Sequence, residues 1–182
     1  DEPHGLSVGD TFNIAGIVEW AGNGWRYYYT KGEMFRVAAV LNATTIETEG
    51  ACRDTYAAAD VEVWKRSGDS FTMGAGKLTV IGPDGIGYPI LFRNLDRVSI
   101  DNVRADGGQV AALSIEDCFG VSGKNVVARQ IDDTFDGYGI AIGNSQDVRI
   151  WGSAYGHFNG FVVGGGPTAG GKVGMNRDIH FD

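Results

Sequence analysis

A short phrase that returns four times in the second half of the chain constrains its fold more than any other feature. Each copy reads polar, apolar, any residue, apolar, and the copies occupy residues 97–100, 125–128, 147–150 and 178–181. Their first apolar residues are spaced by 28, 22 and 31, at Val98, Val126, Val148 and Ile179. Spacings of this size are typical of a solenoid with one such strand per coil.

A second series of short apolar segments lies between these phrases. Its members begin at spacings of 23, 27 and 21, at Ile90, Leu113, Ile140 and Phe161. Two interleaved families of short strands predict a parallel β-helix of about four rungs from about residue 76 onward. Asparagine tolerates left-handed backbone conformations, so it suits the tight corners of such a coil. We expect this role for Asn94, Asn102, Asn125, Asn144 and Asn176.

The end of the chain falls within this pattern. Residues Arg177–Asp182 break off at what should be a rung, so we expect the β-helix to be incomplete at its C-terminus. A rung buries its inner face only against the next rung. The exposed end should therefore be covered by a partner chain or by further coils.

The first third of the chain has a different pattern. Short apolar and aromatic segments alternate with turn residues at 22–24, 31–33 and 42–43. Strands at this density predict a small antiparallel β-barrel or meander. The whole chain is thus expected to be all-β, with this domain at 1–52, a connecting segment at 53–75 and the β-helix at 76–182.

The charge balance narrows the range of partners. The chain carries 15 basic and 23 acidic residues, a net charge of −8. Nucleic-acid binding needs a basic face, so we expect no nucleic-acid partner. A strongly anionic polymer is also disfavoured unless basic residues cluster in space. No apolar run is long enough to cross a bilayer, so we expect no membrane partner.

The cysteines indicate no metal or redox site. Cys52 and Cys118 are the two cysteines of the chain, and we expect two buried free thiols, with a disulfide as the alternative. There is no CxxC and no His/Cys ligand pattern, so neither a metal nor another cofactor is predicted.

Three segments carry a family resemblance. They are the Val8–Thr11 segment with its continuation to Glu47, the rung series from Asn94 to Phe181, and the His-then-glycine segment 156–166 that leads to Asn176–Ile179. Together they resemble the right-handed parallel β-helix proteins of bacteriophage tails, the tailspike and capsule-depolymerase family of the pectate-lyase-like superfamily. The resemblance implies a right-handed helix, a homotrimer, a virion-tail or extracellular location, and recognition of a bacterial surface polysaccharide.

Acidic residues near the rung corners are candidates for catalysis. Glycoside hydrolysis needs two carboxyl groups, and neighbouring rungs lie about 5 Å apart. A close pair could separate its two pKa values into one acid and one base. The alternative is that these acids serve as turn residues. The candidates are Glu116, Asp117, Asp132, Asp133 and Asp136.

Two histidines differ in their expected positions. His157 follows a glycine and precedes an apolar rung, so it should lie at a corner, as a base or sugar contact or as a hydrogen-bonded turn residue. His180 alternates with Ile179 and Phe181 and should face outward, on the surface or at a trimer interface.

Aromatic and basic residues are candidates for carbohydrate binding. Aromatic faces stack on sugar rings, and Trp20, Trp25, Tyr27 and Tyr29 cluster in the first domain, where core packing is the alternative. Arg129 and Arg149, with Lys124, are expected on successive rungs, where they could neutralise a uronate in a lyase. Solvated outer-face cations are the alternative.

The leading hypothesis is a fragment of a tailspike-like protein that recognises a bacterial surface polysaccharide and, in the full-length parent, degrades it as a glycosidase or polysaccharide lyase. One alternative is a secreted bacterial β-helix lyase or epimerase-like enzyme. Another is a non-catalytic adhesin or structural spike segment. The sequence names neither the glycan nor the reaction.

Overall fold

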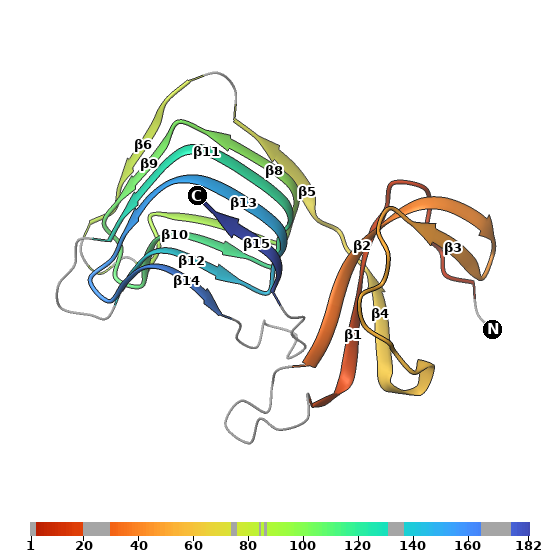
Figure 1. Ribbon diagram of the computed structural model, residues 1–182. Coiled ribbons are helices and arrows are strands. Elements are labelled where there is room, and N and C mark those ends of the chain that lie inside the picture. Colours follow the sequence, from red (N-terminus) through yellow and green to blue (C-terminus); the bar gives the residue numbers. More distant parts are fainter. Residues whose placement is uncertain are drawn as a thin grey trace. The chain divides into compact units, whose positions relative to one another are not determined.

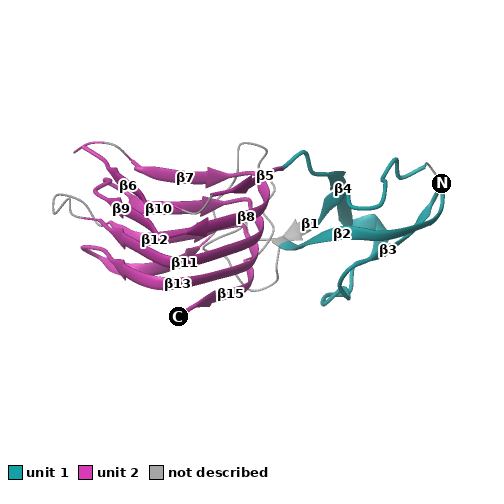
Figure 2. Cartoon of the chain, turned by 90° about the horizontal axis from the view of Figure 1, so that it is seen from above, with its two compact units in different colours: residues 1–68, 166–175 teal, residues 69–165, 176–182 magenta. Residues whose placement is uncertain are grey.

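A computed structural model of the chain describes residues 3–19, 30–73, 76–83, 85, 87–130, 137–164 and 176–182. Apart from one short 3-10 helix, η1 (Ala58–Asp60), the regular structure in these ranges is β-strand. The chain divides into two compact units (Figure 2). One holds the described residues up to Gly68, and the other holds those from Asp69 onward.

The N-terminal unit is an antiparallel sheet of β1 (Thr11–Glu19), β2 (Thr30–Asn42), β3 (Thr45–Thr48) and β4 (Val61–Lys65), in the order β3-β2-β1-β4. Apolar side chains on one side of it form a small core of Leu6, Phe12, Phe35 and Val37. The predicted antiparallel character of this region is confirmed.

Two of the predicted turns in this unit can be checked. Asn42 ends β2, and its Oδ1 accepts a hydrogen bond from the Thr44 amide at 2.9 Å, so the turn at 42–43 is confirmed. The turn at 31–33 is wrong, because Gly32 and Glu33 continue β2 and pair with Ala15 and Ile14 of β1. The turn at 22–24 lies outside the described residues.

The second unit is a parallel β-solenoid, and its first sheet follows the second apolar series of the sequence. The strands are β7 (Ile90–Arg93), β10 (Ala111–Glu116), β12 (Tyr138–Gly143) and β14 (Asn159–Gly164). Their parallel register aligns Ile90, Leu113, Ile140 and Phe161. The spacing of 23, 27 and 21 is therefore one coil in each case, and the prediction of about four rungs is confirmed for this sheet.

The second sheet contains β5 (Asp69–Thr72), β8 (Leu95–Asp101), the first halves of β11 (Phe119–Arg129) and β13 (Gln146–Tyr155), and β15 (Arg177–Phe181). The third sheet contains β6 (Leu78–Ile81), β9 (Val103–Asp106) and the second halves of β11 and β13. Figure 1 shows β11 and β13 bending from one sheet into the other.

This arrangement corrects one member of the first sequence series. The residue aligned with Val98, Val148 and Ile179 is Val121, whereas Val126 pairs with Gly152 in the third sheet. Both valines are buried in the same core, so the apolar pattern alone does not separate them. The register between β11 and β13 shifts between Gly123 and Val126, where the two strands turn the corner.

The corners of the solenoid repeat from coil to coil. Among the described residues, every non-glycine residue with a positive φ lies in one of three columns. The columns are Asn94, Asp117 and Asn144; Arg97, Asp147 and Asp178, with Gly120 at the equivalent place; and Asn102 with Asn125. Asn125 Nδ2 donates to Asn102 Oδ1 at 3.1 Å, so the amides form a ladder along the third column.

The corner predictions for Asn94, Asn102, Asn125 and Asn144 are thus confirmed. Asn176 is not among the positive-φ residues and acts through its side chain instead. Its Oδ1 accepts from the Ser145 amide at 3.0 Å, and its Nδ2 donates to the Gly164 carbonyl at 2.6 Å.

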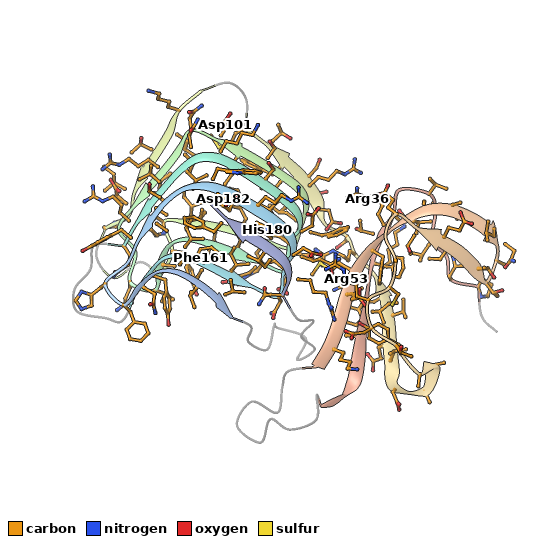
Figure 3. The ribbon with its side chains drawn as sticks, viewed as in Figure 1. Arg36, Arg53, Asp101, Phe161, His180 and Asp182 are labelled. Atoms are coloured by element: carbon orange, nitrogen blue, oxygen red, sulfur yellow. The ribbon has the colours of Figure 1, made fainter. Side chains whose placement is uncertain are left out.

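The solenoid core is apolar and continuous. Val98, Ile100, Leu113, Ile140 and Ile150 are among its fully buried members. In the last described coil, the ring of Phe161, labelled in Figure 3, stacks on that of Phe181 with centroids 4.7 Å apart.

Both cysteines are free, so the disulfide alternative does not hold. Cys118 is buried in the solenoid core as predicted, but Cys52 is exposed, which corrects the expectation that both are buried. Cys52 lies in the irregular segment between β3 and η1, where a side chain is not enclosed between stacked strands.

Candidate functional site

Glu116, the first candidate acid, lies at the end of β10 and pairs in register with Arg93 of β7. Arg93 Nε and Nη2 donate to Glu116 Oε2 at 2.9 and 2.6 Å, and Ser114 Oγ donates to Oε1 at 3.1 Å. The hydrogen bond to Glu116 and its negative charge raise the pKa of Arg93. Both carboxylate oxygens are therefore occupied, and Glu116 links two coils as an ion-paired carboxylate.

The same carboxylate influences a neighbouring phenol. Burial raises the pKa of Tyr88, and the negative charge of Glu116 raises it further. Tyr88 therefore remains a neutral phenol beside the ion pair. On the first sheet, Glu116, Arg93, Ser114 and Tyr88 thus form a cluster in which the Glu116 carboxylate is hydrogen-bonded on both oxygens.

Asp117, the second candidate acid, occupies a corner position of the solenoid. Its φ is 52°, and it lies in the column of Asn94 and Asn144. Its backbone amide donates to the Gly143 carbonyl at 3.0 Å. Aspartate and asparagine are the residues that adopt this conformation most readily after glycine, so turn chemistry accounts for Asp117.

Several other candidates lie outside the described residues: Asp132, Asp133, Asp136, Trp20, Trp25, Tyr27 and Tyr29. Within the described part of that coil, Glu116 pairs in register with Gly143 of β12. The predicted pairing of Glu116 with the acids at 132–136 stays a prediction.

The two histidines lie where the sequence predicts. His157 is exposed at the corner between β13 and β14, and its backbone amide donates to Oε1 of the buried Gln130 at 2.9 Å. His180, labelled in Figure 3, is exposed on β15 in the last described coil. It pairs in register with Arg149. Its outward orientation is confirmed.

The prediction that the three cations lie on successive rungs is wrong for Lys124 and Arg129, which share a rung. Arg149 lies in the second sheet between Ser122 and His180, and its Nε is 3.7 Å from Asp147 Oδ1. Lys124 and Arg129 lie on the same strand, β11, on either side of the bend. Because the chain turns a corner between them, Arg129 belongs to the third sheet and the other two cations to the second.

The outer side of the third sheet brings Arg129 together with residues that the sequence did not single out. Strand register aligns Ile81, Asp106, Arg129 and Tyr155 in one row across four coils. Their side chains point away from the core, because they alternate with the core residues Ala105 and Ala128. We call this surface the Arg129 face, and it comprises Ile81, Arg104, Asp106, Arg129, Ser153 and Tyr155.

Charge on the Arg129 face is arranged unequally. Arg104 Nε donates to Asp106 Oδ2 at 2.7 Å, and Asp106 is only 9% exposed. Asp106 Oδ1 is buried and has no hydrogen-bond partner within the part of the chain that the structure describes. Arg129 is exposed and forms no ion pair with any described carboxylate. The face therefore carries net positive charge in a chain whose total is −8.

The Arg129 face contains one exposed aromatic ring, and another exposed ring follows three residues later in the chain. Tyr155, the register partner of Arg129, is 66% exposed, and Phe158 is 57% exposed. The rings of Tyr138 and Phe158 meet edge to face with centroids 6.0 Å apart. Large exposed aromatic faces next to polar groups are a common way to hold a sugar ring. The sequence indicates that Tyr155 lies at the end of a strand. It does not indicate which side of the solenoid Tyr155 lies on, because that depends on the position of the bend within β13.

Among the residues with assigned positions, none forms a metal site. No cluster of three or more His, Cys, Asp or Glu side chains that could hold a metal occurs within them. The described helical structure contains no segment long and apolar enough to cross a membrane.

Together these features define an all-β protein with a parallel β-solenoid that carries an exposed arginine beside an exposed tyrosine on one face. No protein-family model and no curated protein matches the chain. Solved structures of phage tailspikes do have this fold. The tailspike protein gp49 from Pseudomonas phage LKA1 matches with a TM-score of 0.76 and 21% identity, over 98% of this chain and 30% of that chain.

Two further tailspikes are similar. The Pseudomonas phage phi297 tailspike gp61 has a TM-score of 0.75 and 23% identity, over 90% of this chain and 28% of that chain. The gp54 tailspike of Acinetobacter baumannii bacteriophage AP22, in complex with A. baumannii capsular saccharide, has a TM-score of 0.72 and 22% identity, over 98% of this chain and 29% of that chain. The resemblance to tailspikes therefore holds for the fold, and the chain spans less than a third of each of these proteins.

Proposed function

We propose that this chain is part of a phage tailspike-like protein and that it recognises a bacterial surface polysaccharide. The shared fold supports this proposal, as does the capsular saccharide bound to one of the similar tailspikes. A location in a virion tail and assembly as a homotrimer are further parts of the proposal. They rest on the tailspike resemblance.

The observation that carries the proposal is the pairing of Arg129 with Tyr155 on an exposed solenoid face. Coils of a solenoid repeat at about 4.8 Å, so one face offers similar positions again and again along its axis. Such a surface matches a polymer made of repeating units. An arginine supplies several hydrogen-bond donors, and a tyrosine supplies a flat apolar surface for a sugar ring.

Within this protein, we assign recognition rather than cleavage to the described residues. Glu116 is held by Arg93 and Ser114, and Asp117 serves as a corner residue. These contacts and this backbone conformation give both residues a structural role in the solenoid. Cleavage of the polysaccharide, by hydrolysis or elimination, is a proposal for the complete protein.

The proposal is tested by measuring binding of the 182-residue chain to purified capsular polysaccharides and lipopolysaccharides from Pseudomonas and Acinetobacter strains. We expect saturable binding to at least one polymer. Mass spectrometry of the mixture then separates the functions: unsaturated ends indicate a lyase, added water indicates a hydrolase, and intact polymer indicates a binder or adhesin. Absence of binding to every polymer would contradict the proposal.

A further inference from the structure

The three candidate cations for glycan binding, Lys124, Arg129 and Arg149, differ in their acidic neighbours. Arg149 lies beside Asp147, with 3.7 Å between Nε and Oδ1, and Lys124 pairs in register with Asp101. Arg129 pairs in register with Asp106, but that carboxylate is bound through Oδ2 by Arg104. Among the described residues, Arg129 is thus the one of the three cations whose register-paired or neighbouring acid is already engaged by another arginine.

From this difference we infer that the Arg129 face selects polysaccharides that carry carboxylate groups, as uronic acid residues do. In the bound state the guanidinium of Arg129 donates to the sugar carboxylate, and the ring of Tyr155 packs against the same or the adjacent sugar. This inference deepens the proposed polysaccharide recognition and rests on it. It names the chemical class of the ligand.

The geometry suits such a ligand. Arg129 and Tyr155 are register partners on neighbouring strands, so their backbones lie about 4.8 Å apart and their side chains leave the same side of the sheet. A guanidinium presents a planar fork that matches a carboxylate with two parallel hydrogen bonds. A pyranose ring that lies on the exposed tyrosine can therefore place its carboxylate within reach of the neighbouring arginine.

Charge favours the same class of ligand. The chain as a whole carries −8 and repels polyanions, so a polyanion binds only where positive charge is concentrated. On the Arg129 face two arginines accompany one aspartate, and Arg104 neutralises that aspartate. Attraction of an anionic sugar is consequently confined to the Arg129 face. Because salt screens this attraction, binding should weaken as salt is added.

The test compares each uronate-containing polymer of the panel with its carboxyl-reduced counterpart, in which the acid has become a primary alcohol. We expect reduction to lower the affinity of the 182-residue chain at least about tenfold, the effect of losing one charge-assisted hydrogen bond. Arg129→Gln should cause a similar loss for the carboxylated polymer and little loss for the reduced one. Tyr155→Ala should weaken both, whereas Tyr155→Phe should weaken neither.

Arg97→Asn is the matched control. It removes one exposed positive charge from the second sheet, and asparagine tolerates the positive φ of this position, 61°. It should leave the affinity unchanged. Thermal melting of each variant checks that the fold is intact, which we expect because Arg129 and Tyr155 are exposed.

The outcomes separate the two proposals. Binding that survives carboxyl reduction, or that is confined to polymers without carboxylates, overturns the ligand class and leaves polysaccharide recognition standing. Equal loss in Arg129→Gln and Arg97→Asn overturns the role of the face, because charge anywhere would then suffice. Absence of binding to every polymer overturns the proposed function and this inference with it.

Discussion

The N-terminal sheet and the solenoid satisfy their polar groups in different ways. In the N-terminal sheet one carboxylate, that of Glu33, is only 3% exposed and accepts hydrogen bonds from the amides of Arg53 and Asp54 at 3.1 and 3.0 Å. The Tyr56 hydroxyl donates to the same carboxylate at 3.1 Å. A single side chain thus holds an irregular segment that lies about 20 positions further along the chain.

In the solenoid the same problem is solved by repetition. Asn102 and Asn125 occupy equivalent corners of neighbouring coils, and the amide of one donates to the other. This contact is short-range, because it joins corners of two adjacent coils. We therefore expect a substitution in the solenoid to destabilise mainly the adjacent coils. A substitution at Glu33 should instead destabilise the whole segment that Glu33 holds, residues 53–56.

The largest effect is expected in the solenoid core. Leu113 is fully buried between Ile90 and Ile140, so Leu113→Ala should lower the free energy of unfolding of the solenoid by about 3 kcal/mol through lost burial and a cavity. Leu91→Ala is the control, since Leu91 lies on the outer side of the same sheet and is 37% exposed. Chemical denaturation measures both changes. Equal losses would show that the assigned faces of the sheet are wrong.

Hydrogen exchange on Leu113→Ala tests how far the effect spreads. Amides of β7 and β12, which pair directly with β10, should lose more protection than those of the N-terminal sheet. Uniform loss throughout the chain would contradict the picture of locally coupled coils.

A somewhat smaller effect is expected at Glu33. Glu33→Gln replaces an acceptor-only carboxylate with an amide that has one acceptor oxygen, so it should destabilise the N-terminal unit by about 2 kcal/mol. The amides of Arg53 and Asp54 should exchange faster, because their shared acceptor becomes a neutral amide oxygen and the hydrogen bonds to it weaken. Partial desolvation of the exposed Cys52 thiol raises its pKa, and the negative charge of Glu33 raises it further.

Cys52 therefore reports on the same substitution. Removing the charge of Glu33 should lower the pKa of the Cys52 thiol and speed its alkylation at a fixed, mildly alkaline pH. Glu49→Gln, which alters an exposed ion pair with Arg36, is the control and should leave the rate unchanged. An unchanged alkylation rate in Glu33→Gln would argue against the Glu33 contact.

The corner ladder should show a third and smaller effect. Asn125 has a φ of 52°, so Asn125→Ala imposes left-handed strain and also removes the hydrogen bond to Asn102, at a combined cost of about 1.5 kcal/mol. Asn125→Gly removes the hydrogen bond without the strain and should cost less. Denaturation midpoints of the two variants separate the terms. A glycine variant that is the less stable one would contradict a strain-based role.

The repeated features of the solenoid are the ones that the sequence predicts correctly. The first-sheet register was predictable, because Ile90, Leu113, Ile140 and Phe161 each begin a short apolar segment that is separated by turn residues. The left-handed corners were predictable at the asparagines, because asparagine tolerates the left-handed backbone conformation. Local patterns that recur in each coil are visible in a sequence because the same physical demand is met several times.

Features that occur once, or that depend on counting residues through a corner, were not predictable in this way. Val126 was placed on the wrong sheet because Val121 is equally apolar and the bend within β11 leaves no distinctive sequence signal. That bend also determines the face on which Arg129 lies. The hydrogen-bond donors to Glu33 come from a separate segment of the chain. The sequence of β2 therefore does not indicate that the Glu33 carboxylate is a buried hydrogen-bond acceptor.

The smallest expected effect concerns the pH dependence of the N-terminal sheet. Asp10 Oδ2 accepts hydrogen bonds from Lys65 Nζ at 2.6 Å and from the Ser7 amide at 2.8 Å, and these bonds, the lysine first, lower the pKa of Asp10 below its ordinary value of 3.8. The stabilisation is fully present above that ordinary value and is lost as the pH falls through the lowered one.

Asp10→Asn should therefore cost little at pH 7, no more than about 0.5 kcal/mol, because Lys65 is half exposed and solvent weakens the pair. The difference in denaturation midpoint between the natural chain and the variant should shrink further as the pH is lowered below about 3.8. Lys65→Gln and the double variant complete a cycle that isolates the pair from the Ser7 contact. A difference that grows in acid would reverse the sign of this linkage and show that the carboxylate is not the stabilising form.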